Sequence, residues 1–145
     1  MLPLRLVLDT NVLVSAALKP KGLQGTTLSL ALTKPARLYV SFPILAEYRD
    51  VLARPELPIR KGTRLQLLQL IQNRSYLVKA RHRLEVCNDE DDNRFLEVAD
   101  RAGADYLITG NQRHFPAFWK KTKIITSREF VALAAPHLLK RWARA

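Results

Sequence analysis

The sequence has little cysteine. Cys87 is the only cysteine among the 145 residues, so no disulfide can form within the chain, as expected of a protein in a reducing compartment. Zinc sites of the common type use several cysteines and histidines at short spacing, whereas His82, His114 and His137 are scattered. We therefore expect neither a disulfide scaffold nor a zinc-binding module.

Long apolar runs are also missing. No stretch approaches the roughly 18 apolar residues of a membrane span, and the N-terminus has no apolar segment followed by a small-residue cleavage site. We therefore expect a cytoplasmic protein without a membrane partner. An apolar content of 48% is enough for a real core, and 145 residues are most simply one domain, covering residues 1–145.

Two common catalytic motifs are absent. Ser15, Ser41 and Ser75 lie in no Gly-x-Ser-x-Gly turn, which argues against a serine hydrolase. Gly22 and Gly25 are not followed by the Lys-Ser or Lys-Thr pair of a phosphate-binding loop.

Negative charge is scarce and unevenly placed. The chain has 13 acidic residues against 24 lysines and arginines, a formal net charge of +11. Nucleic acid is the first partner to consider, ahead of an anionic membrane or an acidic protein. Residues 54–83 carry eight basic residues and one acid, residues 120–145 seven and one, whereas residues 85–105 hold eight of the thirteen acids. Each basic run alone is equally well explained as a solvated helix face.

Strand-like and helix-like stretches alternate along the chain. This order predicts an α/β fold with a parallel sheet covered on both faces, which binds ligands beyond the carboxyl ends of its strands. The pattern predicts strands at 4–8, 38–40, 84–86 (weakly), 106–109 and 123–125, and helices at 12–18, 26–33, 42–53 (capped by Ser41), 63–71, 92–101 (ended by Gly103) and 127–133.

A few acids fall where a metal site would need them. Asp9 directly follows the apolar run 4–8, although an Asp at this position also suits the N-cap of the next helix. Glu47 lies close to the apolar face of its helix, where pairing with Arg49 or another neighbour is the simpler explanation. Asp92 belongs to an acidic cluster that would stabilise a helix N-terminus without any other role.

Acids that converge inside a basic protein favour a divalent metal ion over a cationic substrate. Hydrolysis of a phosphodiester needs an activated water and charge neutralisation at phosphorus, and a divalent metal on oxygen ligands supplies both. Basic surroundings with an acidic metal site are typical of a metal-dependent nuclease.

Four blocks of the sequence, in this order and spacing, resemble the PIN-domain family and, within it, the VapC-like toxins of toxin–antitoxin pairs. The resemblance covers nearly the whole chain. Its carriers are VLDTNVLVSA at 7–16, Ser41 and Glu47 with VLARP at 51–55, DDNRFLEVA at 91–99, and ADYLITGN at 104–111 with HF at 114–115.

The resemblance implies a three-layer α/β/α sandwich and an endoribonuclease that uses Mg²⁺ or Mn²⁺. It also implies a cognate antitoxin and a homodimer, for which the segments 65–71 or 131–142 are candidate faces. Asp9, Glu47 and Asp92 match the first three acids of the family. At the two positions where members often place a fourth acid, this chain has Asn111 and His114. Neither supplies a fixed negative charge, so we expect weaker metal binding than in a four-acid site.

Roles follow for the matched residues. Asp9 and Asp92 are the preferred direct ligands, Glu47 either binds the metal or orients the attacking water, and Asn111 is a further candidate ligand. The residues expected to support these ligands or to touch a phosphate are Thr10, Asn11, Ser41, Thr109 and His114.

Other polar and aromatic residues have simpler explanations. Glu97 lies five positions after Asp92, so we expect it to point away from the site and form a salt bridge. Trp119 and Trp142 are near basic residues, but packing is favoured over stacking on bases. Two alternative functions stay open: an RNA-binding or regulatory module with a degenerate metal site, and a structure-specific DNA nuclease.

Overall fold

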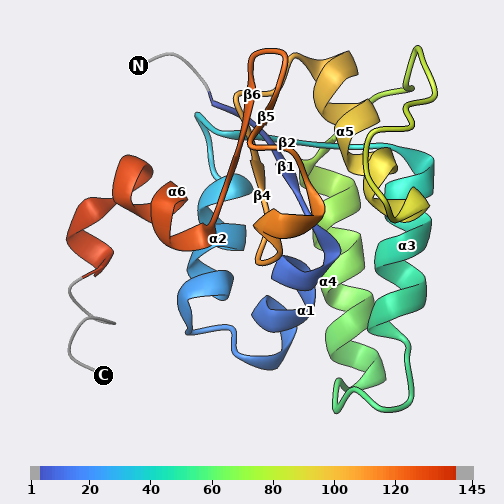
Figure 1. The fold of residues 1–145 in the computed structure, drawn as a ribbon. Coiled ribbons are helices and arrows are strands. Elements are labelled where there is room, and N and C mark those ends of the chain that lie inside the picture. The colour runs from blue at the N-terminus through green and yellow to red at the C-terminus, as the bar shows by residue number, and fades with distance from the viewer. Residues whose placement is uncertain (1–3, 140–145) are drawn as a thin grey trace.

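The computed structural model describes residues 4–139 and has a six-stranded sheet at its centre (Figure 1). The strand order is β3-β2-β1-β4-β6-β5, and every neighbouring pair is parallel except β5 with β6. The strands are β1 (Arg5–Leu8), β2 (Arg37–Val40), β3 (Tyr76–Leu77), β4 (Tyr106–Ile108), β5 (Phe118–Trp119) and β6 (Thr122–Ile125).

Helices cover both faces of the sheet, which confirms the predicted three-layer α/β/α fold (Figure 1). Helix α5 packs against β1, β2 and β4. Helix α2 packs against both α1 and α6. The helices are α1 (Thr10–Leu18), α2 (Leu23–Ala31), α3 (Phe42–Leu52), α4 (Lys61–Arg74), α5 (Glu90–Ala102) and α6 (Ser127–Ala134), with 3₁₀ turns at Gln112–His114 and Pro136–Leu139.

The central strands are buried on both faces, as expected of a parallel sheet between helices. Leu6, Val7 and Leu8 of β1 are fully buried, and Tyr48 of α3 and Phe95 of α5 pack over this strand end. The hydroxyl of Tyr48 donates to the backbone carbonyl of Leu8 at 2.5 Å. The last residue of β1 is therefore held in place directly before Asp9.

Two predicted helix ends are confirmed. Ser41 caps α3, because its Oγ accepts a hydrogen bond from the backbone N–H of Ile44 at 3.3 Å. Gly103 ends α5 with a left-handed backbone (φ +61°), which glycine adopts without strain. The start of α5 differs from the prediction: Asp89 is its N-cap, so Asp92 lies in the first turn rather than at the first position.

The weak strand predicted at 84–86 is wrong. Its alternation of apolar and polar residues is real, but side chains of α5 take its backbone donors. The N–H of Leu84 donates to Oε2 of Glu97 at 2.8 Å, and the N–H groups of Val86 and Cys87 donate to Oδ1 of Asn93 at 3.0 and 2.8 Å. The segment therefore packs onto α5 as a loop, and β3 forms the edge of the sheet instead.

Two strands, β3 and β5, were not predicted from the sequence. Strand β5 forms an antiparallel hairpin with β6. Trp119 on this strand is half-buried and packs against the core, as predicted, whereas Trp142 lies outside the described residues. None of the helices within 4–139 has the length and apolar character needed to cross a membrane.

Candidate functional site

Asp9 lies at the carboxyl end of β1, at the edge of the sheet where β4 also ends. Its backbone N–H donates to the carbonyl of Ile108 at 3.0 Å. Its Oδ1 accepts from the N–H of Thr10 and its Oδ2 from the hydroxyl of Thr109, both at 2.7 Å. Asp9 is thus the N-cap of α1 and is also fixed by the adjacent strand end, so its carboxylate has one orientation.

Glu47 reaches the same place from α3. Its Oε2 accepts a short hydrogen bond from the hydroxyl of Thr10, the residue next to Asp9. Thr10 therefore bonds to both carboxylates, through its backbone and through its side chain. The simpler sequence interpretation, an ion pair with Arg49, does not occur among residues 4–139.

Asp92 comes from the first turn of α5 and is 9% exposed. Its Oδ2 is buried and accepts no hydrogen bond within residues 4–139, although Nδ1 of His114 lies 3.5 Å away. A buried carboxylate oxygen without a donor is costly to folding and is uncommon in proteins. This oxygen is available to a cation.

One pocket of about 450 Å³ collects these acids, and we call it the acid pocket. Its wall comes from α1, α3, the start of α5 and the turn after β4. Seven residues of the predicted site line it: Asp9, Thr10, Asn11, Glu47, Asp92, Asn111 and His114.

Two predicted residues do not line the acid pocket. Thr109 is buried behind it, where its hydroxyl donates to Asp9 and its Oγ1 accepts from the N–H of Asn111 at 2.9 Å. This position suits the supporting role predicted for it. Ser41, in contrast, lines a separate hollow at the start of α3. Ser41 follows the end of β2, but as the cap of α3 it turns its hydroxyl toward that helix.

The carboxylates of the acid pocket raise one another's pKa. Burial is the largest cause for Asp9, Glu47 and Asp92. For Asp92 the charges of Asp9 and Asp89 add to it, and its pKa rises to about 6 although the nearby His114 acts in the opposite direction. The pKa of Glu47 is also raised by its acidic neighbours and lowered by the bond from Thr10. Such a cluster is destabilised by its own charge and favours a bound cation.

Four further charged residues line the acid pocket: Arg54, Glu56, Asp89 and Asp91. Asp91 precedes Asp92 in the first turn of α5. Arg54 follows Ala53, the C-cap of α3, so it lies outside the helix and helical spacing does not predict its place. Arg54 forms no ion pair within residues 4–139, although several acids share its pocket.

The donor set fits a hydrated magnesium or manganese ion. Within 4–139, no three His, Cys, Asp or Glu side chains converge closely enough to enclose a metal by themselves. Mg²⁺, however, keeps several waters and is commonly held by one or two carboxylates together with substrate phosphate. The free Oδ2 of Asp92 and the fixed carboxylate of Asp9 are suited to that mode of binding.

Fold and site together define an α/β protein whose acidic, metal-type pocket lies at the carboxyl ends of a parallel sheet. The PIN domain matches residues 5–113, which is most of the chain. The matched range includes the three acids and the one amide of the predicted ligand set. The chain therefore belongs to the PIN-domain family, a family of nucleases, and the predicted resemblance is confirmed.

Two further comparisons found similar proteins. The uncharacterized protein MJ1680 of Methanocaldococcus jannaschii is 32% identical over 112 residues, which cover 75% of this chain and 72% of that protein. The fold is similar to that in the crystal structure of VapBC2 from Rickettsia felis bound to a DNA fragment from their promoter. That match has a TM-score of 0.59 and 18% identity, and covers 85% of this chain and 98% of the other.

Proposed function

We propose that this PIN-domain protein is an endoribonuclease that depends on Mg²⁺ or Mn²⁺. The observation that carries the proposal is the acid pocket, where Asp9, Glu47 and Asp92 meet from three separate elements and Asp92 keeps a buried oxygen without a donor. The +11 net charge of the chain supports a polyanionic substrate. Its cytoplasmic location is part of the same proposal.

Asp9 and Asp92 would hold the metal, with Asn111 as a neutral oxygen donor beside them. When bound, a divalent ion neutralises charge at the phosphate and lowers the pKa of a coordinated water. Thr10 and Thr109 keep the Asp9 carboxylate in one orientation. Glu47, whose pKa is raised by burial, would orient the attacking water or accept its proton. His114, which lines the same pocket, would support Asp92 or a bound phosphate.

Cleavage of a labelled single-stranded RNA by the purified protein tests the proposal. The reaction is run with Mn²⁺, Mg²⁺ or EDTA, for the wild type and for Asp9→Asn. Asp100→Asn is the matched control, because Asp100 lies on α5 but pairs with Lys120 at 2.7 Å and does not line the acid pocket. We expect metal-dependent cleavage that Asp9→Asn abolishes and Asp100→Asn retains.

The other outcomes identify the alternatives. Cleavage that survives Asp9→Asn indicates a contaminant. A second outcome is RNA binding that depends strongly on salt, does not change with Mn²⁺ and leads to no cleavage. This outcome favours the binding module with a degenerate metal site. Asn111 and His114, which stand where acids are common in the family, would be part of that degenerate site. Cleavage of flap or duplex DNA with no cleavage of RNA identifies the structure-specific DNA nuclease.

The proposed biological role is the toxin of a toxin–antitoxin pair. Its support is the fold shared with the VapBC2 structure. Co-expression with the product of a small neighbouring reading frame should suppress the cleavage, and a neighbour without effect would count against this role.

A homodimer is also proposed, and sedimentation velocity would test it. Helix α4 is one candidate face, since its Leu65 and Leu70 are exposed. The other candidate, 131–142, extends beyond the described residues.

A further inference from the structure

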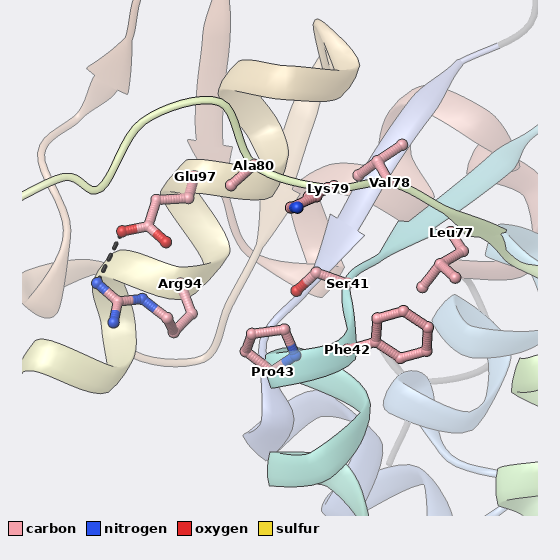
Figure 2. A pocket seen from close by; sticks show the side chains of 9 residues that line it. All are labelled: Ser41, Phe42, Pro43, Leu77, Val78, Lys79, Ala80, Arg94 and Glu97. Carbon is pink, nitrogen blue, oxygen red and sulfur yellow. Dashed lines mark hydrogen bonds and ion pairs between the residues drawn. The ribbon is translucent and has the colours of Figure 1, made fainter.

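A second hollow of about 500 Å³ lies at the start of α3 and is largely apolar. We call it the apolar hollow. Figure 2 shows Phe42 and Leu77 on one side of it and the Arg94–Glu97 ion pair on the other, with Ser41 and Lys79 between them. Phe42 is 72% exposed, which is unusual for a large aromatic side chain at a helix start.

The apolar hollow and the acid pocket are connected along α3 and α5. A third hollow between these helices shares Pro43 and Arg94 with the apolar hollow. It shares Glu47, Arg54 and Asp91 with the acid pocket. Pro43 and Glu47 are four residues apart on α3, which corresponds to about 6 Å along the helix axis. The three hollows therefore form one groove that begins at the candidate metal site.

Acidic side chains outnumber basic ones along this groove, so the phosphates of a bound strand would be held by the basic side chains that have no ion-pair partner. Arg54 at the acid pocket and Lys79 at the apolar hollow form no ion pair within residues 4–139. Arg94, in contrast, donates to both Glu90 and Glu97, at 2.8 and 2.7 Å, so its guanidinium is not free to bind a phosphate. An uncharged planar group fits it better than a phosphate does.

We propose that the apolar hollow binds a nucleobase of the RNA strand cut in the acid pocket, with Phe42 as the stacking platform. The inference rests on the proposed nuclease function and adds to it a base-binding subsite. Base–aromatic stacking tolerates any base, because every base has a π face, so the subsite would position the strand more than it selects a sequence. Lys79 and Arg54 would contact the phosphates at the two ends.

The test measures binding of a short fluorescein-labelled single-stranded RNA in EDTA, so that it does not depend on cleavage. Phe42→Ala should weaken binding about 5- to 150-fold, the range for loss of one stacked base. Phe118→Ala is the matched control, because Phe118 is 65% exposed but lies on β5 and lines none of the three hollows. Phe42→Tyr should retain binding and Phe42→Leu should lose it, since stacking needs the ring.

An RNA with one abasic site, moved along the strand, locates the subsite. At one position the abasic RNA should bind the wild type as weakly as intact RNA binds Phe42→Ala, and the two changes together should add no further loss. Unchanged thermal midpoints would show that the variants fold.

The inference is overturned if Phe42→Ala and Phe118→Ala bind RNA equally well. It is also overturned if Phe42→Ala weakens inhibition by an antitoxin while RNA binding stays intact, because the hollow would then belong to a protein partner. Absence of wild-type cleavage with every metal would contradict the proposed function alone and leave the binding comparison as it is.

Discussion

Two acids of α5 have nearly the same burial but opposite surroundings. Asp92 is 9% exposed and lines the acid pocket, whereas Glu97 is 7% exposed and lines the apolar hollow. Glu97 accepts hydrogen bonds from Arg94 and from the N–H of Leu84. Asp92 has an oxygen without a donor and acidic neighbours that raise its pKa.

The comparison distinguishes a buried carboxylate that stabilises the fold from one that destabilises it. A buried charge paired with Arg and a backbone donor is largely compensated, and it ties the loop before α5 to the helix. A buried charge surrounded by like charges lowers the stability of the metal-free protein. The second arrangement is expected where a cation is to be bound, which is why Asp92 rather than Glu97 belongs to the proposed mechanism.

The largest effect expected is on cleavage. Asp92→Asn should reduce metal-dependent cleavage at least about 100-fold, because a metal ligand contributes several kcal/mol to the transition state. Glu97→Gln should keep most of the activity per folded molecule. Initial rates on labelled RNA with saturating Mn²⁺, corrected for the folded fraction, measure both. Equal losses in the two variants would remove the distinction between the acids.

The next effect is on stability, where the change at Glu97 is expected to be the damaging one. Glu97→Ala should lower the free energy of unfolding by about 3 kcal/mol, because it leaves the mostly buried Arg94 with only the exposed Glu90 and frees the N–H of Leu84. Glu90→Ala, which removes the exposed partner, should cost less than about 1 kcal/mol. Urea unfolding in EDTA measures both. A Glu97→Ala variant as stable as wild type would show that this ion pair is not structural.

The same two acids show how far the sequence predicted the structure. The pattern of an apolar run followed by Asp9, and the separation of Glu97 from Asp92, depend on local spacing along one element. Both placements agree with the structure. The alternation of strands and helices likewise predicted the parallel sheet, because buried strands of this kind are apolar at every position.

What failed depends on contacts between elements. The Leu-Glu-Val segment at 84–86 has the alternation of a strand, but its donors are taken by Glu97 and Asn93 of α5. Ser41 follows a strand end as Asp9 does, yet as the cap of α3 it faces the apolar hollow. Arg54 joins the acid pocket only because α3 lies against α5. None of these contacts is encoded in local periodicity.

A smaller effect sharpens the account of Asp92. Its pKa is raised in the folded protein, from an ordinary value of 3.8 to about 6, so the folded state binds its proton more tightly than the unfolded state does. Wild-type stability should therefore fall as pH rises from about 4 to about 6, and remain lowered above that. In EDTA at pH 8, Asp92→Asn should be more stable than wild type by about 1–2 kcal/mol.

That gain should shrink as pH falls below 6 and vanish below about pH 3, where the wild-type carboxyl is protonated in both states. Thermal midpoints across this pH range measure it. Added Mg²⁺ should raise the midpoint of the wild type and not that of Asp92→Asn. A variant less stable than wild type at pH 8 would mean that Asp92 is compensated by groups such as His114, as Glu97 is by Arg94.

The smallest effect concerns the neutral side of the acid pocket. Asn111 is exposed and lines the pocket at a position where an acid is common in the family. Asn111→Asp should tighten Mn²⁺ binding about fivefold, the effect of roughly 1 kcal/mol expected for a solvated charge a few ångströms from the ion. It should also lower the stability of the metal-free protein slightly, since it adds another negative charge to acids that already repel one another. Gln112→Glu, one position further along, is the control, because Gln112 bonds to Glu129 and the carbonyl of Ile124 instead. Isothermal titration of both variants decides whether the acid pocket is limited by missing charge. Unchanged affinity in Asn111→Asp would place the metal away from residue 111, on the side of Asp9 and Asp92.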